Sequence, residues 1–192
     1  MNNGKDTLVE MNDQNSVLLI IDVQEKLLKI MDRNVTPITI KNINLANLMS
    51  QKMKVPVMVS EQYVKGLGST IPEIAKHLKG IMLHEKMTFS CHDHKELMHE
   101  MHDHNKKFVV LCGMEAHICV FHTAQDLLKQ GFQVIVLSDA VQSSSEHKRE
   151  WALNTISKCG AWVIPTETYI FQLMKRCDSE TFKHWVQTYK SV

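Results

Sequence analysis

The stretch KFVVLCG, residues 107 to 113, continues directly into GMEAHICV at 113 to 120 and HTAQDLLKQG at 122 to 131. The first segment is apolar enough for a buried strand, and the last has the spacing of a helix that ends at a glycine. A turn that begins with a glycine and contains one cysteine separates them. A strand followed at once by a helix is the repeating unit of α/β folds, so this stretch predicts the fold class.

The same alternation continues along the rest of the chain. Further strands are predicted at SVLLIIDV (16–23), VPVMVSE (55–61) and QVIVLSDA (133–140), with weaker ones near 81–87 and 161–166. Helical patterns lie at 36–53, 70–80, 94–104, 122–131, 144–160 and 168–177. Because the strand segments are apolar at nearly every position, both faces of the sheet should be covered. Right-handed connections then give a three-layer α/β/α, Rossmann-like fold with an open, mostly parallel sheet.

The length of the chain suits one domain. Its 192 residues can bury a substantial core, whereas two full domains would be cramped. We expect a single domain over 1–192, with a core from about 16 to 174, a polar N-terminal extension at 1–15 and a helical tail at 178–192.

Composition excludes several classes of partner. Formal net charge is +1, from 22 Lys and Arg against 21 Asp and Glu, so nucleic acid is not expected as a main partner. No apolar stretch is long enough for a membrane span, and the polar N-terminal residues do not resemble a signal peptide. The five cysteines form no CxxC pair, which favours reduced thiols in a cytoplasmic protein. Cys112, Cys159 and Cys177 are expected to fill the core.

Candidate site residues follow the predicted strands, because ligands bind beyond the carboxyl ends of strands in such a sheet. These strand-end positions are Asp22, Glu61, Gln62, Lys86, the segment 113–119 and Asp139. Cys119 stands out because helix N-terminal amides and a nearby cation both favour a thiolate. We therefore expect a depressed pKa for the Cys119 thiol.

Asp22 and Lys86 could complete a reactive site around Cys119. Together the three would supply a base, a cation and a nucleophile, which is a set suited to acyl transfer from an amide or ester. Each residue alone also has a plainer interpretation. A strand-end aspartate commonly caps a helix or binds loop amides, and a lone lysine is commonly a solvated surface charge.

The motifs IIDVQ, EKMTFS and GMEAHICV, which contain Asp22, Lys86 and Cys119 in this order, resemble the Asp, Lys and Cys triad of the isochorismatase-like cysteine hydrolases. The similarity runs from about residue 16 to about 174 and includes SDAVQSSSEHKREWAL. It implies that Asp22 removes the Cys119 proton, that Cys119 attacks a carbonyl carbon, and that Lys86 stabilises the developing charge.

The resemblance has further implications for the turn and the assembly. It implies a cis peptide bond between Met114 and Glu115, with the backbone amides of Glu115 and Cys119 as the oxyanion hole. It also implies a homo-oligomer that acts on a small molecule without a cofactor.

One departure from the family narrows the function. Nicotinamidases of this superfamily carry a DxH metal motif where this chain reads VSEQYVKGLGST, residues 59 to 70, so we assign no metal site there. Isochorismatases proper cleave a vinyl ether and do not need the cysteine. The sequence looks closest to the isochorismatase-domain-containing subgroup, whose natural substrates are poorly defined.

Four residues are candidates for contact with substrate, namely Gln24, Tyr63, Phe89 and His117. Tyr63 belongs to EQYVKGLG, a stretch whose glycines would let a loop approach the pocket closely, although a plain strand-to-helix loop fits as well. His117 lies in the turn before the helix, where capping is an equally good interpretation.

The His-rich segment HDHKELMHEMHDH, residues 92 to 104, is an alternative site. His99 and His102 are one helical turn apart, and imidazole and carboxylate are donors that zinc accepts. We favour a solvated helix face, because no cysteine or fixed ligand spacing accompanies these residues.

Three functions remain open from the sequence. The first is a cysteine-dependent hydrolase of a C–N bond in a small amide or related carbonyl compound. The second is a non-catalytic binding or oligomeric scaffold protein that retains the fold. The third is a ribonuclease, which the near-zero net charge disfavours.

Overall fold

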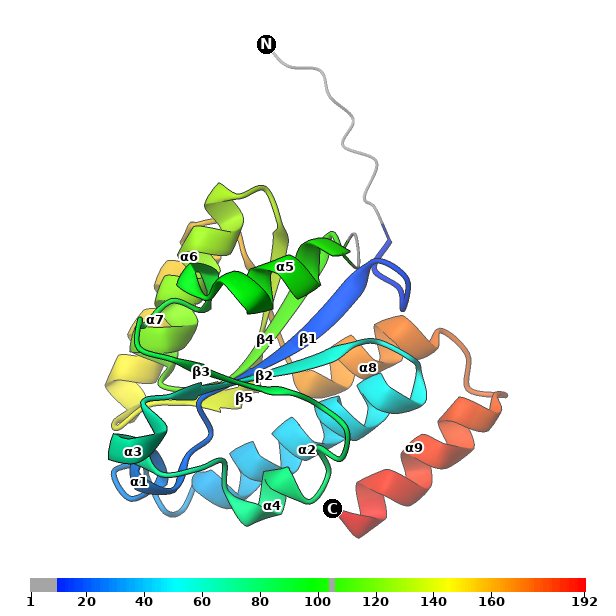
Figure 1. The fold of residues 1–192 in the computed structure, drawn as a ribbon. Helices are drawn as coiled ribbons and strands as arrows, with labels where there is room; N and C mark the ends of the chain where they lie inside the picture. Colours follow the sequence, from blue (N-terminus) through cyan, green and yellow to red (C-terminus); the bar gives the residue numbers. More distant parts are fainter. Residues whose placement is uncertain (1–9, 104–105) are drawn as a thin grey trace.

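Six parallel strands form one open sheet in the order β3-β2-β1-β4-β5-β6 in the computed structural model, which describes residues 10–103 and 106–192 (Figure 1). The strands are β1 (Ser16–Ile21), β2 (Val57–Gln62), β3 (Leu83–Lys86), β4 (Phe108–Met114), β5 (Gln133–Gln142) and β6 (Trp162–Ile164). Every neighbouring pair among them is parallel. The predicted fold class is confirmed, and the sheet is wholly parallel where a mostly parallel one was expected.

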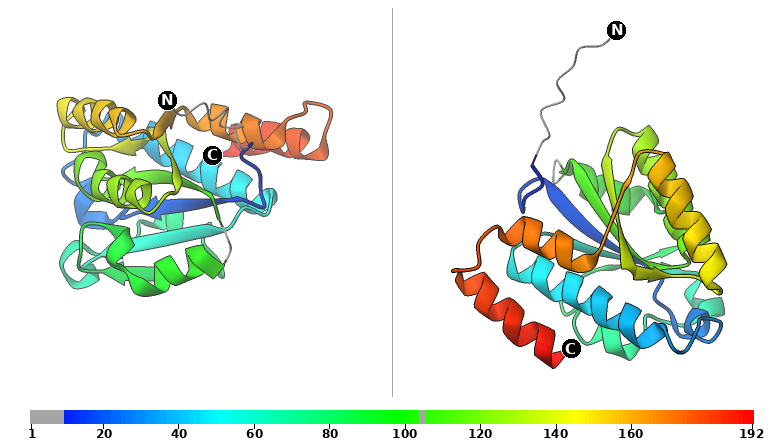
Figure 2. Two further views of the ribbon diagram at one scale, coloured as in Figure 1. Left: turned by 90° about the horizontal axis from the view of Figure 1, so that it is seen from above. Right: turned by 180° about the vertical axis from the view of Figure 1, so that it is seen from behind.

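Helices cover both faces of the sheet. They are α1 (Glu25–Leu28), α2 (Thr36–Lys52), α3 (Val64–Leu67), α4 (Pro72–Ala75), α5 (Lys95–Asp103), α6 (Phe121–Lys129), α7 (Glu146–Lys158), α8 (Thr166–Met174) and α9 (Glu180–Ser191). Figures 1 and 2 show α2 and α8 on one face, with α9 packed against α2, and α5, α6 and α7 on the other. A 3₁₀ turn at Cys91–Asp93 precedes α5, and a π-helical turn at Ala116–Val120 precedes α6.

The helix predicted at 70–80 is much shorter than expected. After α4 the amides of His77 and Leu78 bond three residues back, to Ile74 and Ala75, which is the tighter 3₁₀ pattern. No helix in the described part of the chain combines the length and apolar character that a bilayer span requires.

The core lies on both faces of the central strand β1, because successive side chains of a strand point to opposite faces. Leu18 and Ile20 belong to the cluster that contains residues of α2 and α8, whereas Leu19 belongs to the cluster under α5 and α6. Trp185 of α9 and Met11 are also buried in the first cluster. The segments described from sequence as a tail and an extension therefore both contribute to the core, and residues 1–9 lie outside the described part.

Two of the three cysteines expected to fill the core do not. Cys112 is buried within β4, as predicted, but Cys159 and Cys177 are exposed. Cys159 caps the end of α7, and Cys177 follows the end of α8, so both lie outside the apolar strands. Their positions at helix ends explain why a general preference of cysteine for burial was a poor guide.

Gly113 allows β1 and β4 to approach each other closely. Its φ of 117° lies in the region that favours glycine. A Cβ atom at this position would stand 2.0 Å from the carbonyl oxygen of Ile21 in β1. Both the backbone conformation and the neighbouring strand therefore exclude a side chain.

We predict that Gly113→Ala destabilises the fold by about 3 kcal/mol, because the strands must separate and the left-handed conformation is strained. Gly160→Ala is the matched control, since it also has a positive φ but no atom within 4 Å of the added Cβ. It should cost only about 1 to 2 kcal/mol. Urea unfolding measures both, and equal losses would show that the close approach of β1 and β4 is unimportant.

Candidate active site

The three residues predicted to form the triad meet at the carboxyl edge of the sheet. Asp22 follows β1, Lys86 ends β3, and Cys119 lies in the π-helical turn after β4. Lys86 Nζ stands 2.7 Å from Asp22 Oδ2, and the Cys119 thiol lies close enough to the Asp22 carboxylate for that charge to raise the pKa of the thiol. All three residues are at most 6% exposed. The fold therefore brings a carboxylate, an ammonium and a thiol together away from water.

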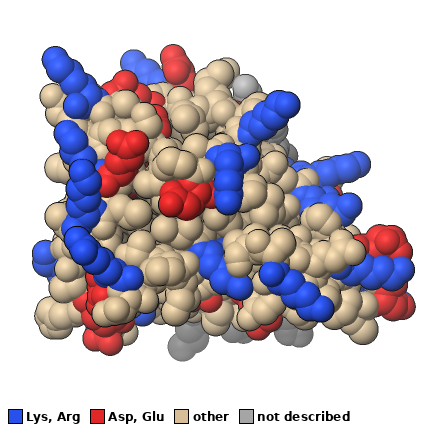
Figure 3. Space-filling model, turned by 90° about the horizontal axis from the view of Figure 1, so that it is seen from below, with Lys and Arg blue, Asp and Glu red and all other residues tan. Residues whose placement is uncertain are grey.

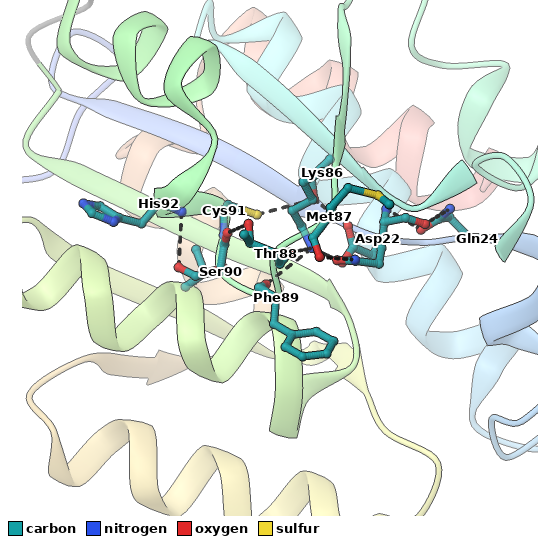
Figure 4. A network of polar contacts seen from close by, with 12 residues as sticks. Asp22, Gln24, Lys86, Met87, Thr88, Phe89, Ser90, Cys91 and His92 are labelled. Carbon is teal, nitrogen blue, oxygen red and sulfur yellow. Dashed lines mark hydrogen bonds and ion pairs between the residues drawn. The ribbon is translucent and has the colours of Figure 1, made fainter. Parts of the chain in front are cut away.

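Lys86 is held by several oxygen acceptors. Besides Asp22, Nζ donates to Gln62 Oε1 at 2.7 Å and contacts the carbonyl oxygens of Thr88 at 3.2 Å and Phe89 at 3.4 Å (Figure 4). Gln62 is fixed in turn, since its amide nitrogen donates to the carbonyl of Met87 at 3.1 Å. The segment after β3 thus wraps around the ammonium group.

The charge of Lys86 is maintained by its neighbours. Burial alone lowers the pKa of the ammonium, but the Asp22 carboxylate opposes this, with smaller contributions from Cys91 and Cys119. The net result is a Lys86 pKa above its ordinary value. Lys86 is therefore a permanent positive charge at neutral pH.

Asp22 is placed by an unusual backbone conformation. Its φ is 51°, in the left-handed region that aspartate and asparagine tolerate better than most residues. Its amide bonds the carbonyl of Ser60 at 3.1 Å, and the Ser60 hydroxyl donates to Asp22 Oδ1 at 2.7 Å. The carboxylate is thus bonded through both oxygens, one to Lys86 and one to Ser60.

Ser60 and Cys91 were not singled out from the sequence. The Cys91 thiol donates to the Ser60 hydroxyl at 3.5 Å, so it extends the hydrogen-bond network on the Ser60 side of Asp22. Burial, followed by the Asp22 charge, raises the pKa of Cys91 to about 11. A polar residue inside the apolar run VPVMVSE was an available signal for Ser60, whereas nothing in the sequence distinguished Cys91.

The expected depression of the Cys119 pKa is wrong. Burial raises the pKa of the thiol and Asp22 raises it further, whereas Lys86 lowers it by less. Cys119 lies in the π-helical turn that leads into α6, so its place near the start of a helical segment is outweighed by burial and by the Asp22 charge. The thiol consequently stays protonated in the resting site.

The turn that carries Cys119 is held by its own side chains. The peptide bond between Met114 and Glu115 is cis, as the resemblance implied. The Glu115 carboxylate accepts a bond from the Ser144 amide at 2.9 Å, and His117 Nδ1 lies 3.0 Å from the Ser143 hydroxyl. Both side chains therefore tie the turn to the segment after β5, so His117 has a structural partner in addition to its predicted contact with substrate.

The other predicted substrate contacts, Gln24, Tyr63 and Phe89, differ in burial and in their partners. Gln24 is fully buried and donates to the carbonyls of Gln62 and Gly68 at 3.0 and 2.6 Å, so it clamps the loop after β2. Tyr63 is 43% exposed on this loop. Phe89 is 58% exposed, stacks on His122, and points away from the network in Figure 4. Gln24 thus supports the loop after β2, and its contact with substrate stays a prediction.

Two strand-end acids have structural partners. Glu61 Oε1 accepts bonds from the amide and hydroxyl of Thr70 at 2.6 and 2.7 Å. Asp139 Oδ1 does the same for Thr166 at the start of α8, at 2.8 and 2.7 Å. These acids support loops and a helix start, and they do not join the triad.

The His-rich segment lies mostly on and before α5. His94 Nδ1 accepts a bond from the Leu97 amide at 3.2 Å, and His102 is exposed beside Phe132. His104 lies outside the described residues. His99 and His102 are exposed on α5, as the prediction of a solvated helix face requires.

A groove of about 830 Å³ lies elsewhere, between α2, α4 and the C-terminal residues. Its lining combines aliphatic side chains, such as Ile38, Ile40 and Leu48, with polar and charged ones, such as Lys41, Glu73 and His77. No cysteine lies among these lining residues. The strand ends are therefore the candidate active site.

Comparison with known proteins gives the family of the chain. The model of the Isochorismatase domain matches residues 16–168. The chain belongs to the isochorismatase family. The secreted isochorismatase effector Isc1 of Phytophthora sojae is 38% identical over 180 residues, which are 88% of this chain and 81% of the relative. Membership of the family supports a hydrolase.

Two solved structures share the fold. The MAR1 ribonuclease from Caenorhabditis elegans has a TM-score of 0.81 at 31% identity, covering 93% of this chain and 91% of that one. YcaC from Escherichia coli, described as an octameric hydrolase of unknown specificity, has a TM-score of 0.83 and covers 95% of this chain and 94% of that one. At 17% identity, YcaC shows the fold alone.

We predict that Lys86→Met destabilises the protein by about 3 to 5 kcal/mol, because the Asp22 carboxylate is left buried without its cation. Adding Asp22→Asn should recover part of the loss, since asparagine tolerates the same φ and carries no charge. Urea unfolding measures the three variants. The control Lys65→Met, at an exposed lysine, should change stability by less than about 0.5 kcal/mol. Equal stability of the Lys86 and Lys65 variants would contradict a large contribution of the Asp22–Lys86 ion pair to folding.

Proposed function

We propose that this protein is a cysteine-dependent hydrolase that cleaves the C–N bond of a small amide or related carbonyl compound. The observation that carries the proposal is the buried Lys86–Asp22 pair with the Cys119 thiol beside the same carboxylate. A nucleophile, a base within hydrogen-bond reach and a fixed cation are the groups that covalent acyl transfer requires.

In the proposed first half-reaction, Asp22 takes the proton of Cys119 as sulfur bonds to the carbonyl carbon. The backbone amides of Glu115 and Cys119 bond the oxyanion, a role supported by their place at a helical start, where amides lack intrahelical acceptors. The protonated Asp22 then gives its proton to the leaving nitrogen. The C–N bond breaks, the amine departs, and a thioester remains on Cys119.

In the second half-reaction, Asp22 removes a proton from water as the water oxygen attacks the thioester carbon. Collapse of this intermediate breaks the C–S bond and releases the carboxylic acid. The sulfur recovers the proton from Asp22, which restores the resting thiol. Each proton thus moves between Asp22 and its immediate neighbours, and no oxidant or cofactor enters the balance.

The raised pKa of Cys119 is compatible with this mechanism. Transfer of the proton to Asp22 leaves a neutral acid beside a thiolate, so the site does not acquire a second negative charge. Lys86 then faces the sulfur as the nearest cation, and its raised pKa keeps it charged. The site needs one shared proton, and it does not need a free thiolate before substrate binds.

Two other functions remain as outcomes of the tests. RNA cleavage is motivated by the name of the Caenorhabditis elegans structure, at 31% identity. Against it, net charge is +1, and acidic side chains lie among the lysines and arginines on the face in Figure 3. A non-catalytic scaffold would keep the fold without turnover.

We also propose a homo-oligomer in a reducing, cytoplasmic compartment. The edge strand β3 and its neighbours expose Met82, Leu83 and Met87, and an apolar sheet edge favours pairing with another copy. None of the five cysteines forms a disulfide. Light scattering measures the oligomeric state, and counting of free thiols on protein taken from cells measures the redox state. A monomer in solution would contradict the proposed homo-oligomer.

Cys119→Ala should lower turnover of a genuine amide substrate by at least about a thousandfold, because the other thiol of the network, Cys91, is fully buried and bonded to Ser60. Release of amine from a panel of small amides measures the rate. Cys159→Ala removes an exposed thiol away from the site and is the control, with full activity expected.

Three outcomes of this panel separate the candidate functions. Unchanged turnover in Cys119→Ala would end the thioester mechanism. Absence of amide turnover in the wild-type chain, with specific RNA cleavage, would favour the ribonuclease. Absence of both would favour the scaffold.

Alkylation of Cys119 by iodoacetamide should accelerate continuously from about pH 7 to about pH 9.5, because a raised pKa keeps the thiolate fraction small throughout this range. Peptide mapping by mass spectrometry follows Cys119, with the exposed Cys159 and Cys177 as references in the same chain. A Cys119 rate that levels off by about pH 7.5 would instead indicate the depressed pKa expected from the sequence.

A further inference from the structure

Imidazole and carboxylate groups gather beside the edge strand β3, near His84, which precedes Lys86 by two residues. His84 belongs to β3, His94 caps the start of α5, and Glu96 lies in its first turn. One ligand-type atom from each lies within 4.8 Å of the other two. The His84 and His94 rings meet edge to face, with centroids 5.3 Å apart. The triad contains none of these three residues.

His84 has an incomplete set of partners. The residue is 4% exposed, and its Nε2 is buried without a hydrogen-bond partner. Glu100 Oε2 of α5 lies 3.3 Å from this nitrogen but outside hydrogen-bonding geometry. A buried polar nitrogen without a hydrogen bond is uncommon in a folded protein, and such a nitrogen is suited to binding a ligand or an ion.

We propose that His84, His94 and Glu96 bind a divalent transition-metal ion of the zinc class, with Glu100 as the adjacent carboxylate. Two imidazoles and a carboxylate form a donor set that zinc accepts, and a fourth position remains for Glu100 or water. The site differs from the DxH position of nicotinamidases, which lies after β2. It also differs from the exposed histidines of α5 because it requires His84 of the sheet.

Small side-chain movements would close the site. Donors about 2.0 to 2.2 Å from a tetrahedral ion lie roughly 3.4 Å apart, so the present groups, which lie within 4.8 Å of one another, must approach by at most about 1.4 Å. Glu96 is exposed and free to move, and His94 is half-buried. His94 must give up its bond to the Leu97 amide, since a neutral imidazole has one nitrogen lone pair. The metal would thus replace a helix cap.

Such an ion would connect two elements of the scaffold. His84 and Lys86 are buried on the same side of β3, two positions apart, whereas His94 and Glu96 belong to the segment that leads into α5. The ion would therefore fix the edge strand that ends in Lys86 against the helix that covers it. Its role would be to hold this strand, and it would not touch substrate.

Calorimetric titration of zinc chloride into the intact, chelator-treated chain tests the site. We expect one ion per chain, at least tenfold weaker binding by Glu96→Gln and loss of this binding by His84→Gln. At one hundred times the dissociation constant, zinc should raise the folded-to-unfolded ratio of the wild-type chain about a hundredfold. Thermal unfolding with and without zinc measures this change in stability. Because Glu96 is exposed, its variant remains informative even if His84→Gln does not fold.

Matched controls distinguish this site from other donors. His102→Gln removes an exposed histidine of the same segment, and Cys119→Ala removes the reactive thiol; both should bind zinc as the wild-type chain does. Cobalt absorption in the visible range gives an independent signature of nitrogen and oxygen ligands. Binding that survives Glu96→Gln unchanged, that disappears in His102→Gln or that is absent from the wild-type chain would overturn the proposal.

Discussion

The buried ion pair between Asp22 and Lys86 is the constraint on which the candidate site depends. Removing two charges from water is expensive, and good geometry with further hydrogen bonds is needed to offset it. Here both side chains are nearly inaccessible; Ser60 donates to the second carboxylate oxygen of Asp22, and Gln62 accepts a further hydrogen bond from Lys86 Nζ. The remaining acceptors are backbone carbonyls after β3. The pair therefore organises the ends of three strands before any substrate is present.

The sheet topology explains why this arrangement can also hold a thiol. Strands β1 and β4 are neighbours, but the helices that follow them lie on opposite faces, so the chain leaves the two strand ends in different directions. Asp22 follows one end and the turn with Cys119 follows the other. Since the Asp22 carboxylate pairs with Lys86 and also raises the pKa of the Cys119 thiol, a single acid connects the cation to the thiol. Burial works against a resting thiolate and leaves the proton in the site for transfer.

The sequence predicted the elements more reliably than the partners of individual side chains. Apolar runs marked the strands because burial of both faces removes the polar alternation, and the order of three motifs indicated the triad. Ser60 and Cys91 were missed because Ser60 bonds Asp22 and Cys91 bonds Ser60, and these contacts join segments far apart in the chain. The support that Gln24 gives to the loop after β2 was missed because spacing from Asp22 gives no side-chain direction. The pKa of Cys119 depends on burial and on two neighbouring charges, which the helix-start argument left out.

The absence of a side chain at Gly113 determines how closely β1 and β4 approach each other beneath the candidate site. At this point β1 and β4 touch through backbone atoms, with the Ile21 carbonyl where a Cβ would stand. Asp22 is the residue after Ile21, and Cys119 follows Gly113 by one short turn. The separation between Asp22 and the turn that carries Cys119 therefore depends on a direct backbone contact between β1 and β4, in which no core side chain takes part.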